Sequence, residues 1–109
     1  PIIAESNFVK ESVPIIKNLL NKYDYKSITV RFKGDLKVLH KRFLKREYSS
    51  ERHMGLVANG VFDDFENFEK TSIKSKEFKI DDNEILVDTT DFLNVDFDDI
   101  IESIQKYMN

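Results

Sequence analysis

Residues 26–47 read KSITVRFKGDLKVLHKRFLKRE, and this stretch decides the fold. Over Lys26–Phe32, apolar and β-branched residues alternate with polar ones, which is the pattern of a half-buried strand. The strand ends at Lys33-Gly34-Asp35, and Asp35 is a preferred residue for capping a helix N-terminus. The apolar spacing after Asp35 continues to about Glu47, so the stretch predicts a strand followed directly by a helix.

The side chains of this helix sort by chemical type around its axis, at about 100° per residue. The apolar stripe contains Leu36, Leu39 and Phe43, and the lysines Lys37, Lys41 and Lys45 lie away from it. Arg42 and Arg46 fall together on one flank of the stripe. The arginines therefore lie beside the predicted buried seam, and the lysines lie in solvent.

Outside this stretch the chain alternates between strand and helix patterns. The expected elements are a buried strand at Ile2–Ala4, a helix at Ser12–Tyr23, an acidic, loosely helical segment at Val61–Lys70, short strands at Glu77–Ile80 and Glu84–Asp88, and a last helix capped by Asp96. Such alternation predicts an α/β fold with a mostly parallel sheet and helices on both faces, in three layers. The length of 109 residues suits one domain.

Composition excludes several classes of site. The chain has no cysteine, which rules out disulfides, zinc-thiolate sites and thiol catalysis. Its two histidines, His40 and His53, lack the spacing of a zinc site, and no residue is assigned as a direct metal ligand. No apolar run is long enough to span a membrane, and no secretory leader is visible, so we expect a cytoplasmic protein without a membrane partner.

Charge is distributed unevenly along the chain. Residues 1–54 carry 12 Lys and Arg against 6 Asp and Glu, whereas residues 55–109 carry 5 against 14. This asymmetry indicates either one face that attracts anions or two solvated helix faces. The phenylalanines Phe62, Phe65 and Phe68 lie in the acidic half, where we expect them to form core or a lid hinge. Nucleic-acid binding would need aromatics within the basic region, so no nucleic-acid partner is expected.

The predicted parallel strands all end in polar residues. These ends are Glu5-Ser6-Asn7, Lys33-Gly34-Asp35 and Asp88-Thr89-Thr90. Because ligands of open parallel sheets bind beyond the carboxyl ends of the strands, these three ends are the expected place for a site.

Four pieces of the sequence together resemble a known family. They are Ile2-Ile3-Ala4-Glu5-Ser6-Asn7-Phe8, the pair Arg42-Phe43 with Arg46, the stretch Glu51-Arg52-His53 with Gly55, and Val87-Asp88-Thr89-Thr90. In this order they resemble the C-terminal part of P-loop kinases, nearest to the small AAA-type ATP-binding kinases related to zeta toxin and chloramphenicol phosphotransferase. The resemblance implies a partial P-loop NTPase fold that lacks the P-loop strand, with a lid-like segment at about residues 42–75.

The chain contains no P-loop of its own. Gly55 and Gly60 have the spacing of the two P-loop glycines, but Val61 and Phe62 stand where a lysine and a serine or threonine are needed. In the related kinases the P-loop strand lies between the strands that Ile2–Asn7 and Lys26–Phe32 resemble. Self-association through exposed sheet edges is therefore expected of this chain alone.

The resemblance implies roles for three arginines and for His53. Arg42, Arg46 and Arg52 would be lid arginines that close over ATP, since guanidinium groups match phosphate oxygens and neutralise charge during phosphoryl transfer. The alternative is that they pair with Glu47, with Glu51 or with the acidic segment. His53 would contact substrate, or would simply fill a loop.

Other residues are assigned at the strand ends. Glu5 would hold Mg²⁺ through water or accept a substrate proton, with Asn7 as its neighbour at the substrate, and the alternative for Glu5 is a helix-capping or salt-bridging role. Asp88, Thr89 and Thr90 resemble the loop that lies near the adenine base; the alternative is a plain strand-to-turn transition.

The resemblance implies phosphoryl transfer from ATP, with Mg²⁺, to a small-molecule acceptor. The alternative is a non-catalytic nucleotide- or protein-binding module with the same fold.

Overall fold

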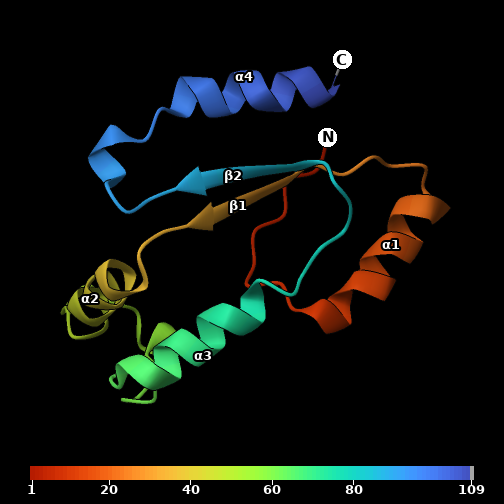
Figure 1. Cartoon of the computed structure of the whole chain (residues 1–109). Helices are drawn as coiled ribbons and strands as arrows, with labels where there is room; N and C mark the ends of the chain where they lie inside the picture. Colours follow the sequence, from red (N-terminus) through yellow and green to blue (C-terminus); the bar gives the residue numbers. More distant parts are fainter. Residues whose placement is uncertain (109) are drawn as a thin grey trace.

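The computed structural model describes residues 1–108. Its elements in chain order are η1 (Lys10–Ser12), α1 (Val13–Lys22), β1 (Thr29–Lys33), α2 (Leu36–Glu47), η2 (Met54–Leu56), α3 (Phe65–Ser75), β2 (Glu84–Asp88), η3 (Phe92–Asn94) and α4 (Phe97–Met108). Figure 1 shows α4 along one side of the two strands and α1 and α3 on the opposite side, with α2 beyond the arrowheads.

The two strands form a parallel sheet, which confirms the α/β class and the parallel pairing. β1 and β2 are neighbours, with Thr29 opposite Glu84 and Lys33 opposite Asp88. The connection between them contains α2 and α3. Both strands therefore end on the same side of the molecule, next to the start of α2.

Local signals explain where the helices begin. The Asp35 carboxylate accepts a hydrogen bond from the Val38 amide at 3.1 Å and caps α2, as its position predicts. Asp96 accepts from the Asp99 amide at 3.0 Å in the same way at α4. Pro14 lies in the first turn of α1, where its missing amide is tolerated.

The prediction of a buried strand at Ile2–Ala4 is wrong. Residues 1–9 contain no strand, and Ile2 and Ile3 are 77% and 97% exposed. A strand needs a neighbour to pair its backbone groups, and within residues 1–108 the edge of β1 away from β2 is unpaired. An apolar, β-branched run alone is not enough.

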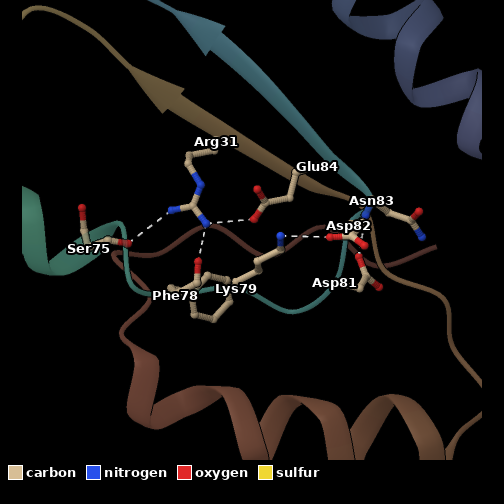
Figure 2. Close-up of polar contacts among 8 residues, drawn as sticks. All are labelled: Arg31, Ser75, Phe78, Lys79, Asp81, Asp82, Asn83 and Glu84. Carbon is tan, nitrogen blue, oxygen red and sulfur yellow. Dashed lines mark hydrogen bonds and ion pairs between the residues drawn. The ribbon is translucent and has the colours of Figure 1, made fainter.

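The prediction of a short strand at Glu77–Ile80 is also wrong. Phe78 and Ile80 are buried, yet the backbone joins no ladder. The side chain of Arg31 holds this segment instead: its guanidinium donates to the carbonyl of Phe78 and, at 3.2 Å, to that of Ser75 (Figure 2). The same guanidinium pairs with Glu84 at 2.9 Å.

The core is small for the length of the chain. The buried apolar side chains among residues 1–108 are those of Phe78, Ile80 and Val87, and each keeps 6–8% of its surface exposed. The accessible surface is 9018 Å², against about 6,300 Å² for a compact monomer of this size. The radius of gyration is 16.0 Å, where about 13 Å is typical. The chain therefore leaves much apolar surface open to water.

A second contact region joins α2 to α3. The ring of Phe43 lies 6.0 Å from that of Phe62 and 5.7 Å from that of Phe68. The ring of His40 lies 5.6 Å from that of Phe65 and 5.0 Å from that of Phe68. These phenylalanines pack the two helices together. None of the described helices is long and apolar enough to cross a membrane.

Candidate functional site

The carboxyl ends of β1 and β2 meet in a hydrogen-bonded junction. The amide and the hydroxyl of Thr89 both donate to the carbonyl of Lys33, at 2.7 and 2.9 Å. The amide of Asp35 donates to the Thr90 hydroxyl at 2.7 Å. Two of the three predicted polar strand ends are therefore joined side by side.

Gly34 allows this close approach. A Cβ atom at this position would lie 3.3 Å from the Thr89 hydroxyl, from the Thr90 amide nitrogen and from a methyl of Leu39. Such contacts are tighter than most Cβ contacts, so a larger residue would push the two loops apart. The glycine thus sets the spacing between the ends of the strands.

Arg42 projects from α2 onto the same junction. Its Nη1 donates to the carbonyl of Thr89 and its Nη2 to the carbonyl of Thr90, both at 2.5 Å. This bidentate fork engages two backbone oxygens instead of an ion pair, so neither alternative of the sequence analysis describes the contact. Arg42 fixes the loop that the sequence assigns to the base.

Asp88 is held in its charged form. Hydrogen bonds from the backbone and then the side chain of Thr90 lower the pKa of the Asp88 carboxyl below its ordinary value. The amide contact to Thr90 measures 2.9 Å, and this closes a short Asx-type turn. The carboxylate therefore stabilises the turn that follows β2.

Arg46 lies one turn beyond Arg42 on the exposed surface of α2. Residues four apart on a helix are neighbours, so the two guanidinium groups share one flank. The side chain of Arg46 makes no hydrogen bond or ion pair with any other residue among residues 1–108. Its donors are available to a ligand.

Arg52 is engaged by the protein itself. Its Nη2 donates to the carbonyl of Leu56 at 2.8 Å, and its Nε lies 3.4 Å from the buried carboxylate of Glu47. The Nε and that carboxylate oxygen lack hydrogen-bond geometry toward each other, so the contact is an ion pair. The structure therefore agrees with the alternative of a pair with Glu47.

His53, Glu5 and Asn7 lie apart from the junction. The Nδ1 of exposed His53 accepts from the Gly55 amide at 3.0 Å and caps η2. Glu5 and Asn7 are exposed in the N-terminal segment and bond to no other described residue. The structure thus brings Arg42 together with Asp88, Thr89 and Thr90. It places His53, Glu5 and Asn7 in contact with none of them.

Sequence reasoning missed three polar side chains that organise the fold. They are Arg31, at the centre of the contacts in Figure 2, and the two buried polar residues of α2, His40 and Glu47. A signal for the last two existed, because on the helical wheel they fall at about 40° and 20° from Leu36, inside the apolar stripe. A polar residue at an apolar position of a helix indicates a buried hydrogen bond.

Two surface hollows lie elsewhere in the described chain. One is lined by residues of β2 and α4, among them Ile85 and Tyr107, and the other by residues of α1 and the turn at Asp81. Neither contains a residue that the sequence assigns to the site.

Within residues 1–108, no group of three or more His, Cys, Asp or Glu side chains could hold a metal ion. Comparisons with protein-family models, with curated proteins and with solved structures found no match to the chain.

Proposed function

We propose that this chain is the C-terminal part of an ATP-binding P-loop kinase, within a three-layer P-loop fold whose P-loop strand lies outside the chain. The reaction is phosphoryl transfer from ATP to a small-molecule acceptor. The observation that carries this proposal is the junction of two adjacent parallel strands with Arg42 on its flank, because phosphoryl-transfer sites of open sheets form at such ends.

The open edge of β1 also supports the proposal. β1 has β2 on one side, and its backbone groups on the other side pair with no described strand. A further strand there would satisfy these groups and cover apolar surface such as that of Phe32, which is 63% exposed. The P-loop strand of the resembling kinases is expected at this edge.

The three arginines would have different roles. Both terminal nitrogens of Arg42 already hold the Thr89–Thr90 loop, so Arg42 would position the surface that receives the base. Arg46, on the same flank and without a protein partner, would contact the phosphates and neutralise developing charge. Arg52, paired with Glu47, would hold the lid-like segment at about residues 42–75 in place.

The described residues do not by themselves form a site for Mg²⁺. Mg²⁺ is bound through one or two carboxylates together with substrate phosphates, and Glu5, the assigned carboxylate, lies apart from the junction. Glu5 would instead accept a proton from the phosphoryl acceptor, and Asn7 and His53 would contact that acceptor.

A non-catalytic nucleotide- or protein-binding module is the second candidate. It is favoured by the engagement of Arg42 and Arg52 with protein atoms, which leaves one free lid arginine. The two candidates differ in turnover and agree in fold.

The test is calorimetry with Mg-ATP on two proteins: the 109-residue chain, and a longer product of the same gene that includes residues encoded before Pro1. We expect the first not to bind ATP at micromolar concentration, and the second to carry a G-x₄-G-K-[ST] motif and to turn ATP over. Arg46→Ala should then lower turnover roughly 10²-fold without lowering the melting temperature.

Three results would distinguish the ideas. Micromolar ATP binding by a monomeric 109-residue chain would contradict the inference that a P-loop strand outside the chain is needed to bind ATP. ATP binding without turnover in the longer protein would favour the non-catalytic module. A lower melting temperature of Arg46→Ala with unchanged turnover would show that Arg46 is structural.

A further inference from the structure

The loop before α3 is held at both ends by the buried polar residues of α2. At one end the amide of Ala58 donates to the Glu47 carboxylate at 2.8 Å. At the other end Nε2 of His40 lies 2.9 Å from the carbonyl of Phe62 and donates to it, since a carbonyl can only accept. The backbone between Ala58 and Phe62 is thus fastened to α2 at two points.

A tight turn occupies the space between these two points. The Val61 amide donates to the Ala58 carbonyl at 3.2 Å, which closes a four-residue turn around Asn59 and Gly60. The φ angles of these two residues are +52° and +82°, as in a type I′ turn, and asparagine followed by glycine is the preferred pair for that turn. The chain contains this pair once.

The same pair brings an amide electrophile next to an unhindered nucleophile. Asn59 and Gly60 are exposed, the Asn59 side chain makes no hydrogen bond within residues 1–108, and the Gly60 amide donates none there. Glycine has no Cβ to shield its nitrogen. We propose that Asn59–Gly60 is a site of spontaneous deamidation and isoaspartate formation.

The reaction needs only water. The Gly60 nitrogen loses its proton to solvent and attacks Cγ of Asn59; the new C–N bond forms as the bond to the side-chain nitrogen breaks, and ammonia leaves. The product is a five-membered succinimide. Water then opens it at one carbonyl to give aspartate, or at the other to give isoaspartate, in which the main chain runs through the former side chain. No oxidant or reductant takes part.

Both products disturb the loop between the two hydrogen bonds that hold it to α2. Each adds a carboxylate at residue 59, in a loop that already carries the acidic residues Asp63 and Asp64. Isoaspartate also adds one methylene to the backbone between the Glu47 and His40 anchors. A turn lengthened in this way cannot keep the spacing of its closing hydrogen bond.

The test follows the folded 109-residue chain during incubation in warm, mildly alkaline buffer. Fragmentation mass spectrometry that separates aspartate from isoaspartate gives the conversion at each asparagine. Asn7, exposed and followed by Phe8, is the internal reference. We expect Asn59 to convert roughly tenfold or more faster than Asn7, because glycine leaves the attacking nitrogen open.

Asn59→Gly is the matched control variant. A Gly-Gly pair also suits the type I′ turn, so the fold is retained while the reactive amide is gone. This variant should abolish the fast release of ammonia. The proposal is overturned if Asn59 in the folded chain converts no faster than Asn7, if it converts only in denaturant, or if Asn59→Gly releases ammonia at the wild-type rate.

Discussion

Replacing Arg42 by alanine should destabilise the fold measurably. The side chain donates two hydrogen bonds, to the carbonyls of Thr89 and Thr90, from a charged group. Hydrogen bonds of charged groups contribute about 1.5–3 kcal/mol each when buried. Arg42 and both threonines are only half-buried, so water replaces part of the loss. We therefore expect a decrease of about 2–3 kcal/mol in the free energy of unfolding.

Urea denaturation of the chain and its variants measures this decrease. Arg46→Ala is the matched control: it removes the same side chain one turn away, where no protein partner exists, and should change stability by no more than about 0.5 kcal/mol. Arg42→Lys, which keeps the charge but not the fork, should fall between the two. If Arg42→Ala were as mild as Arg46→Ala, the fork would not support the junction, and the positioning role would be refuted.

Three further predictions concern other parts of the molecule. Glu47→Ala should lower the free energy of unfolding by about 1–3 kcal/mol, because it leaves the Ala58 amide and Arg52 without their buried partner; thermal denaturation checks this, and an unchanged melting temperature would contradict it. The lowered pKa of Asp88 adds stability above the ordinary value of 3.8 that is lost as pH falls through the folded-state value; Asp88→Asn should therefore show a smaller loss in acid denaturation, and a loss equal to wild type would speak against the Thr90 contacts. The open edge of β1 should make the 109-residue chain self-associate as concentration rises, so a monomer at every concentration in light scattering would be the opposite result.

Local signals in the sequence were sufficient for α1, α2, α4 and the two strands, whereas the segment expected at Val61–Lys70 is helical only from Phe65, where Asp64 caps α3, and the helix continues to Ser75. Asp35 and Asp96 cap α2 and α4 as expected, and the alternation around Val30 lies in β1, which begins at Thr29 rather than Lys26. The failure at Ile2–Ala4 has a different cause. Whether an apolar run becomes a strand depends on a neighbouring backbone, which its own residues do not encode.

The candidate site was predictable in position and less so in detail. The rule that parallel strands end at one edge correctly placed Asp88, Thr89 and Thr90 beside Gly34. The partner of Arg42 could not be deduced, because a guanidinium fork fits two carbonyls as well as two phosphate oxygens. Glu47 was considered only as a possible ion-pair partner of the arginines, although its place on the helical wheel indicated burial.

The parallel pairing of β1 with β2 also has consequences for the folding rate. Every rung of this ladder joins residues 55 apart in the chain, such as Thr29 and Glu84. Closing a loop of that length opposes folding by about 3.5 kcal/mol before the first rung forms. The contacts of α2 with α3 are more local and can precede it. We therefore expect slow folding through a state with helices formed and the sheet still open, a state in which aggregation competes with completion of the fold.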